Sequence, residues 1–160
     1  MTELYRPVAA DRIGPRGLEL TVEADVAECA ALAKRMEIPE VRSLSCRFRV
    51  TRDREDRFAA SGHLRARVVQ TCVVSLEEFA AEIEERFRLR FVPAGKETEE
   101  IDPDDPVDEV GYADGMLDLG EAAAEQLGLT LDPYPRRPGA VLPEQDTDEV
   151  PGPFAGLRRN

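Results

Sequence analysis

The sequence predicts an α+β fold in which an antiparallel sheet, built as a meander, carries helices on one face. Three observations lead to this prediction. Four separate runs alternate apolar and polar residues, as half-buried strands do. Two other segments place apolar residues at helical spacing. Short segments, "TRDREDR" and "CVVSLEE", join the last three runs, which indicates hairpins between neighbouring strands.

The first three runs cover residues 18–22, 44–50 and 58–68, and each keeps its apolar residues at one parity. Between the first two runs, "EADVAECAALAKRMEIPE" repeats apolar residues at helical spacing and ends before Pro39, which a helix does not easily pass. We expect one helix there. Its apolar positions are Val26, Cys29 or Ala30, Ala33 and Met36.

The fourth run, residues 79–91, fits two interpretations. Its apolar parity holds Phe79, Ala81, Ile83, Phe87, Leu89 and Phe91. The phenylalanines and Ile83 would also suit a helix at four-residue steps, and Glu85 breaks the alternation. A period of two accounts for Ala81 and Leu89 as well, so we predict a strand.

The remainder of the chain predicts a connector, a helix and a tail. Residues 94–108 are acidic, contain prolines and hold almost nothing apolar, which is typical of an extended or mobile connector. A helix is expected to begin near Asp118, a good capping residue. Its apolar face holds Leu119, Ala122, Ala123 and Leu127. We therefore predict a single domain over residues 1–140, followed by a disordered tail at 141–160.

Composition favours a cytoplasmic globular protein. The chain has 160 residues, enough for one domain, and no apolar run approaches the roughly 20 residues of a membrane-spanning helix. The polar opening does not resemble a secretory signal. Residues 1–92 contain 16 basic and 16 acidic residues, whereas residues 93–160 contain 5 and 17, so the net charge of −12 comes from the second part.

The three cysteines and the single histidine predict no metal site or cofactor. Cys29 and Cys46 fall on apolar faces, where a free cysteine behaves as a small hydrophobic residue. Cys72 ends a strand beside a turn, but Ser75 stands where a second zinc ligand is expected, and no neighbouring residue offers a base. Packing is the favoured role for Cys72, with metal binding or catalysis as the alternative. His63 lies at a polar position of its strand.

No sequence motif of an enzyme is present. The chain has no glycine-rich phosphate loop and no nucleophile elbow, and its carboxylates gather mainly in the connector. We therefore expect no catalytic activity and no small-molecule substrate.

Seven arginines are predicted to share the sheet face that is turned away from the core, because they occupy the parity opposite to the apolar residues. They are Arg47, Arg49, Arg65, Arg67, Arg86, Arg88 and Arg90. Arginine suits phosphate, so these residues are candidate RNA contacts. Without aromatic residues between them, such a site would hold the RNA backbone and not read bases. The alternative is a solvated face with cross-strand ion pairs.

The acidic segment from Glu97 to Glu109 is a second candidate site, for a basic partner such as a ribosomal protein. Its acidic residues are Glu97, Glu99, Glu100, Asp102, Asp104, Asp105, Asp108 and Glu109. The segment could instead fold over the arginine face and compete with nucleic acid. A segment that only keeps the protein in solution is the simpler alternative.

Two stretches, "QTCVVSLEEFAAEIEERFRLRFVP" and "MLDLGEAAAEQLGLTLDPYPRRPGA", resemble the YceD family, the bacterial and plastid proteins named for large ribosomal RNA subunit accumulation. The resemblance runs from about Val22 to Ala140. It includes the turn from Cys72 to Leu76, the strand ending "FVP" and the "DLGE…EQL" helix followed by "PYPRRPG".

The resemblance also bears on the metal question. Many family members carry a C-x-x-C pair at this turn and a second pair after the final helix, which looks like a zinc site. Here Cys72 matches the first cysteine, Ser75 replaces the second and "PYPRRPG" replaces the distal pair. This departure supports the expectation of no metal.

The family implies a role in 23S rRNA accumulation or processing and in large-subunit biogenesis. We therefore expect a non-catalytic factor that contacts rRNA or the assembling pre-50S particle, with a protein adaptor as the alternative.

Overall fold

The computed structural model describes residues 3–96 and 107–137. The predicted tail at 141–160 and residues 97–106 of the predicted connector lie outside the described residues. The elements are β1 (Pro7–Ala9), η1 (Ala10–Arg12), β2 (Leu18–Glu23), α1 (Val26–Met36), β3 (Glu40–Arg54), β4 (Arg57–Thr71), β5 (Glu78–Pro93), β6 (Asp108–Tyr112), β7 (Met116–Asp118) and α2 (Leu119–Thr130).

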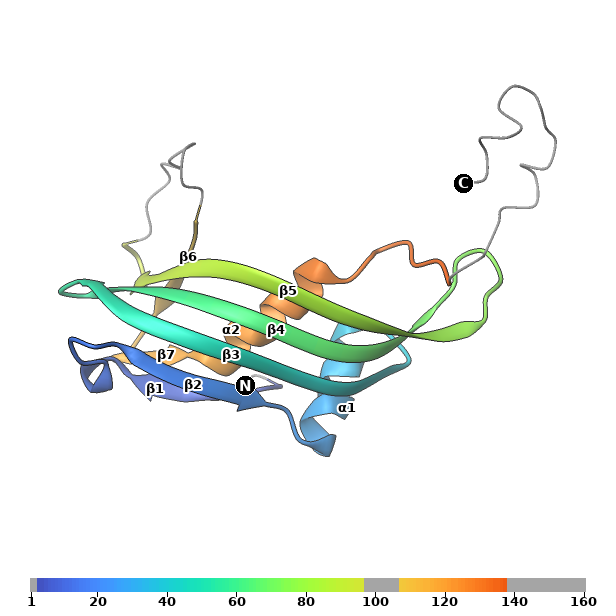
Figure 1. Cartoon of the computed structure of the whole chain (residues 1–160), viewed down its shortest axis with the longest axis horizontal. Coiled ribbons are helices and arrows are strands. Elements are labelled where there is room, and N and C mark those ends of the chain that lie inside the picture. The colour runs from blue at the N-terminus through green and yellow to red at the C-terminus, as the bar shows by residue number, and fades with distance from the viewer. Residues whose placement is uncertain (1–2, 97–106, 138–160) are drawn as a thin grey trace, which may run out of the picture.

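The main sheet has five strands in the order β2-β3-β4-β5-β6 (Figure 1). The first four strands are antiparallel neighbours, as the four alternating runs predicted, and β6 adds to β5 in parallel. A small second sheet pairs β1 with β7. These findings confirm the α+β class and the predicted antiparallel sheet.

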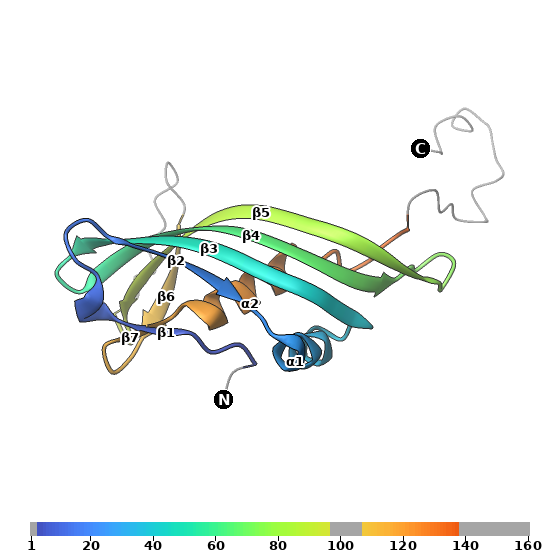
Figure 2. The same cartoon turned by 60° about the horizontal axis from the view of Figure 1, so that its bottom comes forward.

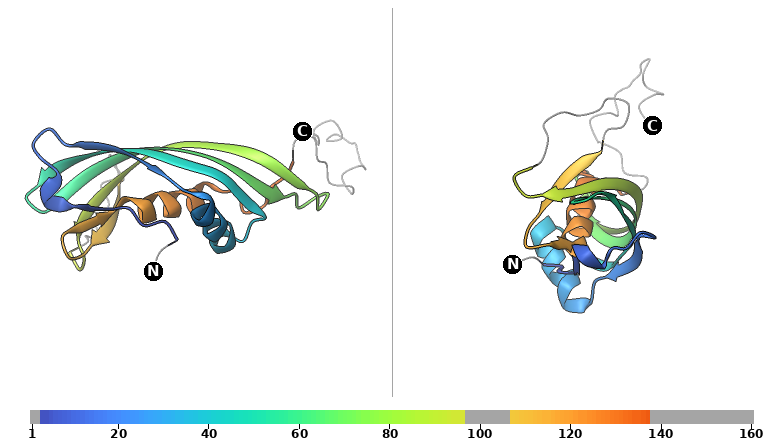
Figure 3. Two further views of the ribbon diagram at one scale, coloured as in Figure 1. Left: turned by 90° about the horizontal axis from the view of Figure 1, so that it is seen from below. Right: turned by 90° about the vertical axis from the view of Figure 1, so that its left-hand side faces the viewer.

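Both helices lie beneath the arched main sheet, so its other face is left uncovered by them (Figures 2 and 3). Side-chain caps set the start of each helix. The carboxylate of Asp25 accepts the backbone N–H of Glu28 at 2.7 Å, and Asp118 accepts that of Glu121 at 3.1 Å. Such caps satisfy N–H groups that have no partner within the helix. Asp118 therefore caps α2, as the sequence predicted.

The core lies between the sheet and the helices. The largest fully buried side chains include Phe48, Phe58 and Phe91 from the sheet. The four residues predicted for the apolar face of α2 are all buried. In α1 the prediction was partly wrong: Val26 is 88% exposed, and Leu32 is buried instead. Val26 is the first residue of the helix, whereas the buried residues Cys29, Leu32 and Ala33 lie further along it.

The fourth alternating run is the strand β5, so the helical alternative was wrong. Its alternation is real, but only its second half is deeply buried: Leu89 and Phe91 are buried, whereas Ile83 and Phe87 are half-buried. Gly62 on β4 lies opposite Phe87 on β5, and the Phe87 ring occupies the space that a side chain at Gly62 would fill.

The predicted connector overlaps β6 by its last residue, Asp108, and Glu109, the last residue of the predicted acidic segment, also belongs to β6. The short strands β1, β6 and β7 were not predicted. Each has five residues or fewer, and its pairing partner is distant in the sequence or parallel, so little alternation could show. Among the described residues, no helix is long and apolar enough to cross a membrane.

Candidate nucleic-acid interface

The seven predicted arginines come from β3, β4 and β5 and alternate with inward-facing residues. On β3, for example, Arg47 and Arg49 flank the buried Phe48. Six of the seven are exposed, and only Arg90 is half-buried. The alternation therefore places them on the face that the helices do not cover.

Strand register arranges four of these arginines in two cross-strand rows. Arg47 pairs in register with His63, which pairs with Arg86. Arg49 likewise pairs with Ser61, which pairs with Arg88. Each row thus has an arginine on β3, a smaller residue on β4 and an arginine on β5.

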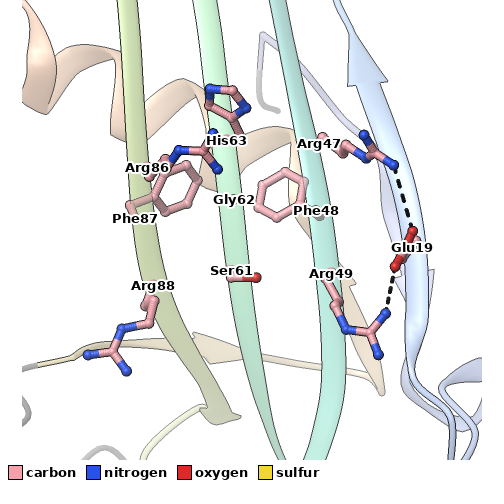
Figure 4. Close-up of a pocket in the computed structure, with 10 residues that line it drawn as sticks. All are labelled: Glu19, Arg47, Phe48, Arg49, Ser61, Gly62, His63, Arg86, Phe87 and Arg88. Carbon is pink, nitrogen blue, oxygen red and sulfur yellow. Dashed lines mark hydrogen bonds and ion pairs between the residues drawn. The ribbon is translucent and has the colours of Figure 1, made fainter.

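The two rows line a shallow groove of about 750 Å³ (Figure 4). Its arginines, Arg47 and Arg49 on one side and Arg86 and Arg88 on the other, flank the middle strand. The floor is β4, where Ser61 and the backbone of Gly62 leave room. The remaining lining residues are Glu19, Phe48, His63 and Phe87.

Among the residues that the structure describes, Glu19 on β2 is the one carboxylate that lines this groove. It accepts a hydrogen bond from Arg49 at 2.6 Å and lies 4.0 Å from Arg47. The lining residues thus hold four arginines against one glutamate. One negative charge offsets at most one of four positive charges, so Glu19 neutralises only part of the charge of these lining residues.

The other end of the same face is electrically balanced. Arg65 lies 3.6 Å from Glu84, and Arg67 lies 3.5 Å from Glu82. Glu84 also lies 2.6 Å from Nε2 of His63. This hydrogen bond, together with the charge of Arg65, lowers the pKa of Glu84. The predicted alternative of cross-strand ion pairs therefore describes this half of the face.

Arg90 takes part in a structural network at the edge of the sheet. It lies 3.3 Å from Asp53 and 3.9 Å from Glu109, and Glu109 also lies 3.9 Å from Arg57. The Glu109 side chain is only 12% exposed. Glu109 therefore joins β6 to β4 and β5. From the sequence, it was predicted to bind a basic partner protein.

Of the eight acidic residues predicted to bind a partner, six lie outside the described residues. Asp108 and Glu109 are the two that the structure places, and both are in β6. Asp108 is exposed.

The cysteines occupy the places expected for core residues. Cys29, Cys46 and Cys72 are all free and buried. Burial raises the pKa of Cys29, and it raises that of Cys46 to about 12. Among the described residues, no group of three or more histidine, cysteine and acidic side chains could hold a metal ion.

Cys72 sits in a tight turn whose N–H groups point at its sulfur. The backbone N–H groups of Val74 and Ser75 each donate to Sγ at 3.4 Å. Burial raises the pKa of the thiol, but hydrogen bonds from Ser75, Arg137 and Val74 outweigh it and lower the pKa to about 6. Leu76 closes the turn through an N–H bond to the Cys72 carbonyl at 2.9 Å.

The segment after α2 packs against this turn. Nε of Arg137 donates to the Ser75 hydroxyl at 3.1 Å and lies 3.1 Å from Glu77. The N–H of Val73 donates to the carbonyl of Pro135 at 2.9 Å. The two stretches that carried the family resemblance are therefore in contact.

Sequence reasoning found the arginines but not the groove. Glu19, Ser61 and His63 line it, and none was predicted as a site residue. The available signal was the small pair Ser61 and Gly62 in the middle of a long strand. The position of Ser61 opposite Arg49 and Arg88 depends on the strand register, which cannot be derived from the sequence pattern.

Fold and groove together define a class of protein: a helix-backed antiparallel sheet with a cationic groove on its uncovered face. Residues 60–157 match the family described as "Large ribosomal RNA subunit accumulation protein YceD". The match covers more than half of the chain, and the chain belongs to this family. The matched range, residues 60–157, begins later and ends later than the resemblance seen in the sequence, which runs from about Val22 to Ala140. No curated protein and no solved structure matches the chain.

Proposed function

We propose that this protein is a non-catalytic factor in 23S rRNA accumulation or processing during biogenesis of the large ribosomal subunit. In this proposal it acts in the cytoplasm and contacts rRNA, free or in the pre-50S particle, through the arginine groove. The family name supports the process, since it refers to accumulation of large-subunit ribosomal RNA. The groove supplies a physical means of contact.

One observation carries the RNA contact: among the described residues, the groove is lined by four arginines and one carboxylate, although the whole chain has a net charge of −12. A locally positive groove on an acidic protein attracts a polyanion at that place and repels it elsewhere. Guanidinium groups donate in pairs to phosphate oxygens. The groove thus favours a phosphate backbone as its ligand.

The test is crosslinking of the protein to RNA in cells, followed by sequencing of the RNA. We expect fragments of 23S rRNA to be enriched with the natural protein. The groove variant carries Arg47→Gln, Arg49→Gln, Arg86→Gln and Arg88→Gln, and we expect it to lose most of this enrichment.

A matched control comes from the same face. Arg65→Gln with Arg67→Gln also removes positive charge, but these arginines are paired with Glu84 and Glu82. We expect the control to retain crosslinking. Equal enrichment of 23S rRNA with the groove variant would refute the groove as the contact.

Mass spectrometry of co-purified proteins examines the adaptor alternative in the same experiment. Recovery of basic ribosomal proteins without RNA crosslinks, abolished when residues 97–109 are deleted, would replace the RNA proposal with the adaptor. Recovery of both RNA and ribosomal proteins is expected if the protein docks on the pre-50S particle.

A further inference from the structure

We propose that the groove is a clamp for two successive phosphates of one RNA strand, which runs along β4 in single-stranded form. This inference rests on the proposed function, because it takes rRNA as the ligand. It adds the form of RNA that is bound, the number of phosphates held and the residues that hold each one.

The two rows define two phosphate positions. Row one is Arg47, His63 and Arg86, and row two is Arg49, Ser61 and Arg88. Their arginines stand on β3 and β5, which are about 9.5 Å apart because two strand spacings separate them. An anion held between them must accept hydrogen bonds from both sides. A phosphodiester does so, because its two free oxygens point in different directions.

The spacing between the rows suits a polymer. Rows two residues apart along a strand are separated by about 6.7 Å. A ligand that fills both rows therefore carries at least two linked anions along β4. Successive phosphates of a polynucleotide meet this condition, and so does the chain of an inorganic polyphosphate.

The floor of the groove favours a narrow ligand. Ser61 is small, and among the described residues its hydroxyl makes no hydrogen bond, so it can donate to a phosphate oxygen. A second hollow of about 220 Å³ continues the groove past Arg49, Ser61 and Arg88 toward Ala59 and Val107. The two hollows together follow the line of β4.

Single-stranded RNA fits this path better than a duplex. The uncovered face is arched (Figure 3), so a stiff duplex lying on it touches only a short length. A flexible strand can follow β4 and set its backbone between the arginines. Among the described residues, no phenylalanine, tyrosine or tryptophan projects among the arginines of the two rows, and His63 is held by Glu84 at 2.6 Å. We therefore expect the protein to hold the backbone without a stacking platform for bases, and to bind independently of sequence.

The experiment measures binding of the purified full chain to a short fluorescent oligouridylate across a range of salt concentrations. An RNA hairpin with the same number of phosphates is the duplex probe. For single strands, each phosphate that the protein neutralises adds about 0.7 to the slope of log affinity against log salt. Row one is removed by Arg47→Gln with Arg86→Gln, and row two by Arg49→Gln with Arg88→Gln.

We expect each row variant to lower the slope by about 0.7, and the variant lacking both rows by about 1.4. Arg65→Gln with Arg67→Gln serves as the control and should leave the slope near that of the natural protein. Inorganic tripolyphosphate should displace the oligouridylate at much lower concentration than orthophosphate. Thermal unfolding of every variant checks that it is folded.

The outcomes separate this inference from the proposed function. If the hairpin binds as tightly as the single strand, or if a folded row variant keeps the full slope, the clamp is refuted while 23S rRNA crosslinking can still hold. If the oligouridylate binds and each row variant lowers the slope as expected, but 23S rRNA is not crosslinked in cells, the clamp stands and the proposed function fails.

Discussion

At the scale of single residues, Gly62 shows how one side chain position shapes the groove. Its neighbours across the sheet are Phe48 on β3 and Phe87 on β5, whose rings meet edge to face at 5.8 Å between centroids. A Cβ at Gly62 would overlap the Phe87 ring. Glycine therefore lets the ring cover β4 on the core side, below the groove floor.

Replacing Gly62 by alanine is expected to destabilise the protein. Phe87 must move, and such overpacking usually costs about 1–3 kcal/mol in the free energy of unfolding. Gly14→Ala is the control, because nothing lies within 4 Å of the added carbon. It should change the free energy of unfolding by less than about 0.5 kcal/mol. Urea unfolding measures both, and equal effects would contradict the role assigned to Phe87.

Cys72 is expected to make stability depend on pH. Its pKa of about 6 in the folded protein lies below the value of about 8.5 for an unfolded cysteine. The unfolded state therefore holds the proton more tightly between these values, so stability rises with pH across this window. The contribution is complete above about pH 8.5 and is lost as the pH falls through about 6.

Chemical unfolding of the natural protein and of Cys72→Ala at several pH values tests this. The difference in unfolding free energy between the two should widen as the pH rises from about 6 to about 8.5. Cys29→Ala is the control, because burial raises the pKa of Cys29 and no such widening is expected. A constant difference for Cys72→Ala would show that its thiol stays protonated.

At the scale of elements, β6 is held to the sheet by Glu109 as well as by its ladder with β5. The Glu109 carboxylate lies between Arg57 on β4 and Arg90 on β5. We expect Glu109→Gln to loosen β6, because the two partly buried guanidinium groups lose their shared carboxylate. Hydrogen exchange of the backbone amides of residues 109–112 should become faster, while that of β3 stays unchanged.

Asp108→Asn is the matched control for this prediction. Asp108 is the exposed neighbour on the same strand and carries the same charge. We expect no change in exchange for it. If the two variants behave alike, the Glu109 carboxylate does not hold β6 to the sheet.

At the scale of the whole molecule, the uncovered face divides into a cationic half and a balanced half. Glu82→Gln with Glu84→Gln is expected to extend the cationic half, because Arg65 and Arg67 lose their carboxylate partners. RNA affinity should rise several-fold at low salt, and the gain should shrink as salt screens the charges. Fluorescence anisotropy with an oligouridylate measures the effect.

The control here removes the same amount of negative charge elsewhere. Asp11→Asn with Glu37→Gln affects two residues that line neither hollow along β4. The gain in affinity should be much smaller, because surface charges beyond about a Debye length, about 10 Å at ordinary salt, are screened. Equal gains would mean that net charge alone, and not the face, governs RNA binding.

The sequence by itself determined the four long strands, the two helices and the face from which the arginines project. These features follow from local rules: a period of two puts alternate side chains on opposite faces, and a cap residue starts a helix. That is why the parity of Phe48 and Phe91 was enough to predict where Arg47 and Arg90 lie.

Only the tertiary structure decided which residues stand opposite one another. Register put Glu82 and Glu84 beside Arg67 and Arg65, and it set Ser61 between two arginines. The parallel pairing of β6 with β5 placed the Glu109 carboxylate near Arg57 and Arg90. These pairings join residues distant in the chain, and sliding a strand by two residues would keep every parity while changing every partner. Local pattern therefore predicts the face, whereas long-range packing determines the groove.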